Sequence, residues 1–376
     1  MSKDKVIGVV GLGAMGLGIA QVFAQAGFAV RATDANTGAR ETAHERLRAS
    51  LAPRIAAGKM TVEGQAAALG ALQIVETPAK IGAADMIVEA ILEDMGAKKA
   101  LWAELEPMAG PTCIFATNTS ALSVAAMSEG LRHPERLLGL HFFNPAPVMK
   151  LVELVGHHGT SQAALAVARR LTEAAGKTVI SSPDRPGFIV NRCARPFYGE
   201  ALAMLEEGRS ASDVDASMLA AGYRMGPFSL IDLIGADINL AATEGLAAAM
   251  EDHPRYHVFD GLRTQVANGD LGRKTGEGFL FPAKPGAAPH DATAIAARIE
   301  ATLINEAASL VAEAGSNPGD VDTAMRLGLN FPRGPFEALA AYGARAVEDT
   351  LMALENHAPA HLKGRYRPAA NLKELI

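Results

Sequence analysis

Short apolar runs alternate with helical patterns along the first half of the chain. The runs are rich in β-branched residues and end at glycine or polar residues, which is typical of buried strands. They lie at Lys5–Val10, Phe28–Thr33, Ala84–Val88, Cys113–Thr117, Leu137–Phe143 and Leu151–Val155. Helical spacing between them predicts helices at Ala14–Ala26, Thr37–Ala57 and Gly96–Met108, with a shorter helix opened by Thr61. This alternation predicts a parallel sheet covered by helices on both faces.

The pattern changes at Ser181–Gly187, where two prolines and a glycine mark a linker. Strand patterns nearly vanish beyond this segment. We expect helices at Ile189–Glu207, Ala211–Ala221 and Phe228–Met250, so the second half of the chain is predicted to be mostly α-helical.

The helical half contains an internal repeat. Three motifs recur in the same order, with offsets of 106 to 108 positions. They are Arg192…Glu200-Ala201 with Arg298…Glu306-Ala307, Asp213–Met218 with Asp320–Met325, and Gly226–Phe228 with Gly334–Phe336. The Pro/Gly/Ala-rich stretch Pro282–Pro289 lies between the copies as a linker. We therefore expect an α/β domain at 1–182, a helical domain at 183–281, and a truncated second helical copy at 292–376.

Composition agrees with a globular protein of two or three domains. The chain has 376 residues, 49% of them hydrophobic and 20% charged. The net charge of −6 gives no reason to expect nucleic acid or an anionic membrane as a partner.

The sequence gives little information about the cellular compartment. Met1–Val30 superficially resembles a signal peptide, but glycines interrupt it, and we expect no cleavage there. No apolar stretch approaches the roughly 20 residues of a membrane span. The two cysteines, Cys113 and Cys193, are too few for a disulfide framework, so we expect a reducing, cytoplasmic compartment.

A glycine-rich turn follows the first predicted strand and opens the first helix. In Gly11-Leu-Gly-Ala-Met-Gly16, Gly11 allows a tight turn, Gly13 lets the backbone approach a pyrophosphate, and Gly16 permits close packing of helix on strand. The phosphates would lie at the helix N-terminus. Asp34, after the second strand, suits ribose hydroxyls and would repel a 2′-phosphate, which favours NAD over NADP. Two alternatives stay open: phosphate binding by Arg31 or Arg40, and a glycine-rich turn without a ligand.

His141 and Glu153 stand at the end of one predicted strand and within the next. Dehydrogenation of an alcohol needs a base for the hydroxyl proton, and histidine titrates in the right range to work in both directions. A carboxylate on the other ring nitrogen would fix the tautomer and stabilise the imidazolium. A structural histidine and a solvated glutamate are the alternative interpretation of this pair.

Two further polar residues follow expected structural boundaries. Ser120 comes after the strand Cys113–Thr117, at the sheet edge where open α/β sheets bind ligands, although it could equally cap the next helix. Asn191 lies near the start of the first helix after the linker, where its amide could reach a cleft or bond locally.

Together these residues resemble the 3-hydroxyacyl-CoA dehydrogenase family over nearly the whole chain. The segments that carry the resemblance are Val9–Gly16 (VVGLGAMG), Val88–Glu93 (VEAILE), Asn118–Ser120, His141–Glu153 (HFFNPAPVMKLVE), Pro186–Arg192 (PGFIVNR), Met225–Phe228 and Gly272–Phe279 (GRKTGEGF). The resemblance implies an α/β Rossmann-type NAD-binding domain, followed by an all-α domain in two copies with the second truncated. It also implies hydride transfer between NAD and C3 of an (S)-3-hydroxyacyl-CoA, as in fatty-acid β-oxidation or bacterial phenylacetate breakdown.

The resemblance assigns a role to each candidate residue. His141 is the implied general base and Glu153 its orienting carboxylate. Ser120 and Asn191 are implied to bind the reacting oxygen or the thioester, Asn144 to lie in the active site, and Lys59 to face the CoA phosphates. The implied cofactor-binding residues are Gly11, Gly13, Ala14, Met15, Gly16, Asp34, Ala90, Glu93 and Lys98. No metal ion is expected.

The second helical copy is expected to be structural. Ala297 stands where the repeat register places the counterpart of Asn191, and no second His–Glu pair follows. In relatives with one copy, the helical domain forms a dimer interface, so the duplication implies a monomer that is a pseudo-dimer within one chain.

Two other functions remain open at this point. One is a hydroxy-acid dehydrogenase of the same fold that does not use CoA, similar to gulonate dehydrogenases and lens lambda-crystallin. The other is a catalytically silent NAD-binding protein. Acyl chain length is not readable from the sequence, although Arg195 and Arg209 are possible partners for a terminal carboxylate on the acyl chain.

Overall fold

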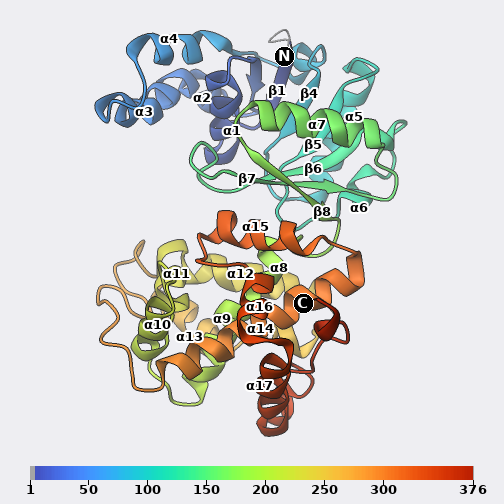
Figure 1. The fold of residues 1–376 in the computed structure, drawn as a ribbon. Helices are drawn as coiled ribbons and strands as arrows, with labels where there is room; N and C mark the ends of the chain where they lie inside the picture. Colours follow the sequence, from blue (N-terminus) through green and yellow to red (C-terminus); the bar gives the residue numbers. More distant parts are fainter. Residues whose placement is uncertain (1–4, 376) are drawn as a thin grey trace. The chain divides into compact units, whose positions relative to one another are not determined.

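The computed structural model describes residues 5–375. The chain divides into two compact units, residues 1–185 and 186–376 (Figure 1). The first unit is built on a β-sheet and the second on helices. The two helical copies expected from the sequence together form the second unit.

The first unit contains an eight-stranded sheet in the order β3-β2-β1-β4-β5-β6-β7-β8. The strands are β1 (Val6–Val10), β2 (Ala29–Thr33), β3 (Leu72–Ile74), β4 (Met86–Glu89), β5 (Ile114–Thr117), β6 (Leu137–Phe142), β7 (Leu151–Gly156) and β8 (Thr178–Pro183). Strands β1 to β6 pair in parallel, as predicted, although β3 was not expected from the sequence. Because these strands share one direction, the residues that follow them gather at one edge of the sheet.

The expected parallel arrangement of the sheet is interrupted at β7. This strand pairs antiparallel with β6, and β8 in turn runs parallel to β7. The physical reason is the short connection Phe143–Lys150, since parallel neighbours need a longer crossover, whereas antiparallel neighbours can be joined by a brief loop. Strand β8 also occupies part of the segment expected to be a linker.

The helices of the first unit are α1 (Ala14–Gln25), α2 (Thr37–Glu41), α3 (Ala43–Ala56), α4 (Val62–Ala71), α5 (Met95–Leu105), α6 (Val124–Ser128) and α7 (Gln162–Ala174). Among them, α1 packs against β1 and β2, and α7 packs against β7 and β8 (Figure 1). The expected single helix over Thr37–Ala57 is two helices that meet at Thr42. Side-chain caps start several of them, and Thr61 accepts a hydrogen bond from the Gly64 N–H at the start of α4.

The second unit is helical throughout its described residues, apart from loops and an isolated bridge between Gly272 and Glu277. Its helices are α8 (Val190–Cys193), α9 (Arg195–Glu206), α10 (Ala211–Ala220), α11 (Pro227–Ile234), α12 (Ala236–Ala249), α13 (Asp260–Ala267), α14 (Ala292–Ala314), α15 (Pro318–Leu329), α16 (Pro335–Tyr342) and α17 (Ala344–His357). The expected helix Phe228–Met250 is broken at Gly235, whose φ of +106° lies outside the helical region.

The predicted repeat is visible in the helices. Helices α11 and α16 have 8 residues each, and α12 and α17 have 14 each. Helices α11 and α16 also begin in the same way. Asp215 accepts hydrogen bonds from backbone N–H groups at the start of α11, and Asp322 does the same for α16. These shared capping contacts support duplication of one structural unit.

Buried ion pairs cross between the two copies reciprocally. Arg192 in α8 binds Glu306 in α14 at 2.6 Å, and Arg298 in α14 binds Glu200 in α9 at 2.6 Å. Each arginine also binds a more exposed glutamate, at positions 313 and 207 respectively. Such reciprocity is the pattern of a two-fold symmetric interface, here made within one chain.

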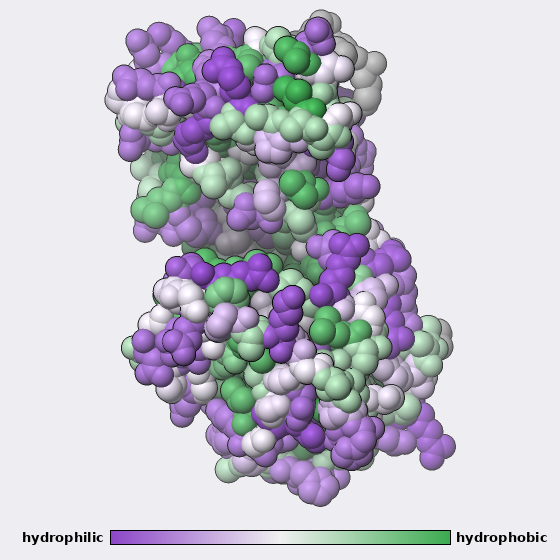
Figure 2. Space-filling model, turned by 90° about the vertical axis from the view of Figure 1, so that its left-hand side faces the viewer, coloured by the Kyte–Doolittle hydropathy of each residue, from purple (hydrophilic) through white to green (hydrophobic). Residues whose placement is uncertain are grey.

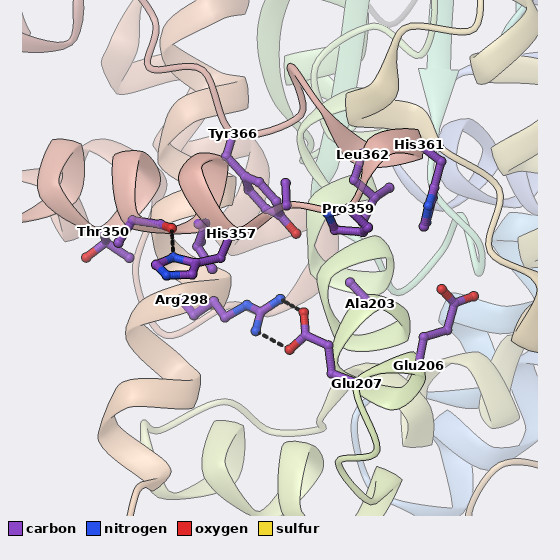
Figure 3. A pocket seen from close by; sticks show the side chains of 13 residues that line it. Ala203, Glu206, Glu207, Arg298, Thr350, His357, Pro359, His361, Leu362 and Tyr366 are labelled. Carbon is purple, nitrogen blue, oxygen red and sulfur yellow. Dashed lines mark hydrogen bonds and ion pairs between the residues drawn. The ribbon is translucent and has the colours of Figure 1, made fainter.

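A cavity of about 700 Å³ lies beside one of these ion pairs, between α9, α14 and α17 (Figure 3). Arg298 points from α14 to the Glu207 carboxylate in α9, so its charge is already balanced (Figure 3). His357 bonds the Ala353 carbonyl within α17. The polar groups at this cavity are therefore largely engaged by the protein itself.

Hydrophilic and hydrophobic residues are interspersed over the face drawn in Figure 2. Among the helices of residues 5–375, none is both long and apolar enough to cross a bilayer.

Arg298→Met is expected to lower the free energy of unfolding of the helical unit by about 3 kcal/mol. Glu200, which has no solvent exposure, would lose one of its cationic partners while staying buried. Urea unfolding followed by far-UV circular dichroism measures this change, and Trp102 fluorescence reports separately on the first unit. Arg345→Met is the matched control, because Arg345 is 94% exposed and should cost less than about 1 kcal/mol. Equal effects of the two substitutions would contradict the importance of the buried pair.

Candidate active site

The glycine-rich turn between β1 and α1 has the geometry of a phosphate-binding turn. Gly11 has a φ of +97°, and a Cβ there would lie 2.4 Å from the Ala90 carbonyl oxygen. A Cβ on Gly16 would lie 1.9 Å from the Gly11 carbonyl oxygen. Gly13 is different, because nothing lies within 4 Å of the position its Cβ would take. Gly11 and Gly16 are thus required by packing, whereas Gly13 keeps open space in front of the helix N-terminus.

The other residues of the turn fit the same arrangement. Gly13 is the N-cap of α1, and Ala14 and Met15 form its first turn. Gly13 and Ala14 are exposed and Met15 is half-buried, so backbone N–H groups at this helix end can reach a ligand.

Asp34 follows β2 and faces the glycine-rich turn. Its carboxylate accepts hydrogen bonds from the backbone N–H of Leu12, at 2.6 Å, and of Asn36, at 2.7 Å. Each carboxylate oxygen has a second lone pair, so the group can still accept hydrogen bonds from ribose hydroxyls. Arg40 in α2 donates hydrogen bonds to the carbonyl oxygens of Asp34 and Ala35, so its side chain lies against the loop after β2.

A buried charge cluster follows β4. Lys98 in α5, only 1% exposed, binds the carboxylate of Glu89 at 2.6 Å and that of Glu93 at 3.2 Å. Glu89, at the end of β4, has no exposure and also accepts hydrogen bonds from Thr117 and the Ile91 N–H. Because its carboxylate binds groups from β5, from α5 and from the segment after β4, it fixes these elements relative to one another.

Glu93 connects this cluster to Ser120. One Glu93 oxygen accepts from the Ser120 N–H at 2.9 Å, from the Ser120 hydroxyl at 3.3 Å and from the Thr119 hydroxyl at 2.7 Å. Burial alone would raise the pKa of Glu93, but the Thr119 hydrogen bond and the Lys98 charge lower it overall. Glu93 is therefore a charged anchor for the loop that carries Ser120.

His141 and Glu153 form a buried pair across the antiparallel strands. They are directly opposite in the β6–β7 register, so both side chains project from the same face of the sheet. The His141 Nδ1 lies 2.7 Å from the Glu153 Oε2, with His141 6% exposed and Glu153 not exposed at all. A carboxylate at Nδ1 holds the neutral imidazole with its proton on that nitrogen, so Nε2 carries the basic lone pair. The strand reversal that the sequence did not predict is what creates this pairing.

Other residues support this edge of the sheet and were not singled out from the sequence. The Asn118 side chain, after β5, accepts from the Phe142 N–H at 2.8 Å and so ties the end of β6 to its neighbour. Lys177 donates to the carbonyl oxygens of Ala146 and Met149, which holds the loop containing Asn144. Burial lowers the pKa of Lys177 to about 8. The sequence could have indicated Asn118, because it is an asparagine directly after a predicted strand. It could not have indicated Lys177, because a lysine before a strand is not a distinctive pattern.

The loop held by Lys177 also lies against α1. A Cβ on Gly18 would lie 3.2 Å from Pro147 and 3.3 Å from Ala146, so the loop and the helix are in close contact. Asn144 in this loop is exposed. The loop after His141 is thereby fixed to the helix that starts at the glycine-rich turn.

Two candidate residues belong to other parts of the fold. Lys59 is exposed in the turn between α3 and α4. Asn191 is half-buried in α8 and belongs to the second unit. Within residues 5–375, no group of three or more histidine, cysteine, aspartate or glutamate side chains is placed to hold a metal ion.

Comparison with known protein families matches both units. The model of the 3-hydroxyacyl-CoA dehydrogenase NAD-binding domain matches residues 6–185. The model of the C-terminal domain of the same family matches residues 187–281 and again residues 295–376. The chain belongs to the 3-hydroxyacyl-CoA dehydrogenase family. The family match identifies the first unit as an NAD-binding domain, and the second match to one model supports the duplication.

Individual members of the family show the extent of the similarity. A 3-hydroxyadipyl-CoA dehydrogenase of Escherichia coli is 40% identical over 280 residues, which is 74% of this chain and 59% of that relative. A probable 3-hydroxybutyryl-CoA dehydrogenase of Bacillus subtilis is 38% identical over 277 residues, 73% of this chain and 96% of its own. The crystal structure of an E. coli K12 3-hydroxybutyryl-CoA dehydrogenase matches with a TM-score of 0.92 at 31% identity, covering 99% of this chain and 98% of that one.

Substitutions of two glycines of the turn are expected to separate binding from folding. Gly13→Ala should leave thermal stability nearly unchanged but raise the Kd for NADH roughly tenfold or more, because the new methyl group takes the space that the pyrophosphate approaches. Gly16→Ala should destabilise the first unit by about 1–3 kcal/mol, since its Cβ has no room. Thermal unfolding and NADH fluorescence titration measure the two effects. A stable Gly16→Ala protein, or a Gly13→Ala protein with unchanged NADH affinity, would refute these roles.

Proposed function

We propose that the protein catalyses the reversible, NAD-dependent oxidation of (S)-3-hydroxyacyl-CoA to 3-oxoacyl-CoA. The observation that carries the proposal is the His141–Glu153 pair, buried and 2.7 Å apart, on the same sheet as the glycine-rich turn. Family membership supplies the reaction type, and the pair supplies a base suited to it.

The proposed reaction removes two hydrogens from the substrate, one from C3 and one from the hydroxyl group on C3. His141 takes the hydroxyl proton on Nε2 as the C3–O bond becomes a carbonyl, and the C3 hydrogen leaves as hydride. Bound NAD supplies the hydride acceptor. Glu153 stabilises the imidazolium that forms and keeps Nε2 directed at the hydroxyl. In the reverse direction, protonated His141 returns the proton to the carbonyl oxygen.

The remaining residues take proposed binding roles. Ser120 and Asn191 bind the reacting oxygen or the thioester, with Asn144 nearby in the active site and Lys59 toward the CoA phosphates. Cofactor contacts are proposed for the turn residues Gly11, Gly13, Ala14, Met15 and Gly16, together with Asp34, Ala90 and Glu93. Lys98 is almost fully buried and bound by two carboxylates, which supports a positioning role through Glu93.

The test is the substrate range of the purified protein. NADH consumption with acetoacetyl-CoA, and NADH production with (S)-3-hydroxybutyryl-CoA, are the expected outcomes. Turnover of free hydroxy acids without turnover of either thioester would replace the proposal with a dehydrogenase that does not use CoA. NADH binding without turnover of any of these substrates would identify a catalytically silent protein.

His141→Gln is expected to lower kcat by roughly 10²–10⁴ while NADH binding stays nearly intact, because only the proton transfer is lost. Glu153→Gln should also lose much of its rate, since an amide can hold the wrong imidazole tautomer. Steady-state kinetics with acetoacetyl-CoA and NADH titration measure the two quantities. If either variant keeps its full rate, the substituted residue has no part in the reaction.

We also propose that the protein is a monomer in the cytoplasm. The reciprocal pairs Arg192–Glu306 and Arg298–Glu200 support a pseudo-dimer in which the second copy replaces a partner subunit. The low number of cysteines supports a reducing compartment.

The pseudo-dimer predicts the effect of a truncation. The full chain should be chiefly monomeric at micromolar concentration, whereas a chain ending near Phe281 should dimerise or precipitate because α9 and α10 lose the packing of α14. Light scattering on both proteins measures this, and NADH binding checks that the first unit is still folded. A full-length dimer whose state is unaffected by the truncation would contradict the pseudo-dimer.

A further inference from the structure

One buried arginine lacks the partner that the others have. Among residues 5–375, four arginines are at most 8% exposed. Three of them lie near a carboxylate: Arg136 near Glu106, Arg192 near Glu306 and Arg365 near Glu200. Arg195 is 8% exposed, and no carboxylate of the described residues forms an ion pair with it. The charge of Arg195 is therefore not balanced by the protein.

The contacts of Arg195 are neutral. Its Nε donates to the carbonyl oxygen of Asn191 at 3.1 Å, and its Nη1 donates to the Thr243 hydroxyl at 3.1 Å. Its guanidinium lies 4.9 Å from the centre of the Tyr198 ring. A guanidinium has five N–H donors, so these contacts leave donors available.

A second polar group in the same place also lacks an acceptor. The Asn239 side chain is 1% exposed, and its amide nitrogen has no hydrogen-bond partner among the described residues. The hydroxyl of Thr243, which contacts Arg195, donates a hydrogen bond to the backbone carbonyl oxygen of Asn239. This cluster thus has more donors than acceptors, and it carries a positive charge.

An unbalanced buried cation is costly to keep. Burial disfavours the charged form and lowers the pKa of Arg195, yet arginine does not lose its proton in proteins. Arg209, the other arginine that the sequence suggested, already binds Asp291 at 2.6 Å. The structure therefore separates the two candidates, and only Arg195 has capacity for an added anion.

We propose that Arg195 binds a carboxylate at the far end of the acyl chain, so that the preferred substrates are 3-hydroxyacyl thioesters that end in a carboxylate. This inference rests on the proposed function. Arg195 follows Asn191 by four positions, and its Nε bonds the Asn191 carbonyl oxygen, so the two side chains start about one helical turn apart. A short acyl chain with Asn191 near its thioester end can reach Arg195 with its other end. Arginine also offers the paired donors that suit a carboxylate.

The test compares two substrates of equal carbon number, a six-carbon 3-hydroxydicarboxylyl-CoA and 3-hydroxyhexanoyl-CoA. The unmodified protein should have the higher kcat/KM with the dicarboxylyl substrate. Arg195→Gln should lower the ratio of the two kcat/KM values roughly 10–100-fold, which is the usual worth of a hydrogen bond to a charged group. Arg195→Lys should restore part of the ratio. Arg209→Gln is the matched control and should leave the ratio unchanged.

Each other outcome has a distinct meaning. If the unmodified protein turns over both substrates with no preference for the carboxylate, the inference about Arg195 is wrong and the proposed function stands. If it turns over neither, the proposed function itself fails. An equal fall with both substrates in Arg195→Gln would indicate a CoA or NAD phosphate as the bound anion and would overturn the inference. Should Arg195→Gln not fold, the preference of the unmodified protein and the Arg195→Lys ratio still decide the matter.

Discussion

A carboxylate that is fully removed from water must be surrounded by donors, and this constraint organises both units of the protein. Among the described residues, Glu89, Glu153, Glu200 and Glu306 have no solvent exposure. Each is held by a cationic or hydrogen-bonding partner from a different element of its own unit. Because removing one partner leaves a buried charge uncompensated, these contacts permit very little change in geometry.

In the first unit, the constraint fixes the edge of the sheet where the candidate site lies. Glu89 binds Lys98 and Thr117, and Lys98 in turn reaches Glu93, which holds the Ser120 loop. Glu153 orients His141 from the neighbouring antiparallel strand. The cofactor turn, the Ser120 loop and the base are therefore set by one connected framework, as a reaction that needs fixed alignment of base and hydride acceptor requires.

Local patterns in the sequence were sufficient for much of this arrangement. Glycine spacing predicted the β1–α1 turn, and the structure shows why Gly11 and Gly16 have no room for a side chain. The repeated motifs predicted the duplicated helices, down to Asp215 and Asp322 at equivalent helix starts. Features set by distant partners were not predictable in this way. The burial of Glu89 and the missing partner of Arg195 both depend on which strands and helices become neighbours, which no local spacing encodes.

The proposed reaction depends on the fate of one atom, the hydrogen on C3 of the substrate. To follow it, the protein is incubated with NAD and (S)-3-hydroxybutyryl-CoA that carries deuterium at C3, and the mass of the NADH formed is measured. We expect NADH that contains one deuterium, together with 3-oxobutyryl-CoA that has lost it. Unlabelled NADH, or a thioester that keeps its deuterium while NADH forms, would show that hydride is not transferred from C3 and would refute the proposed reaction.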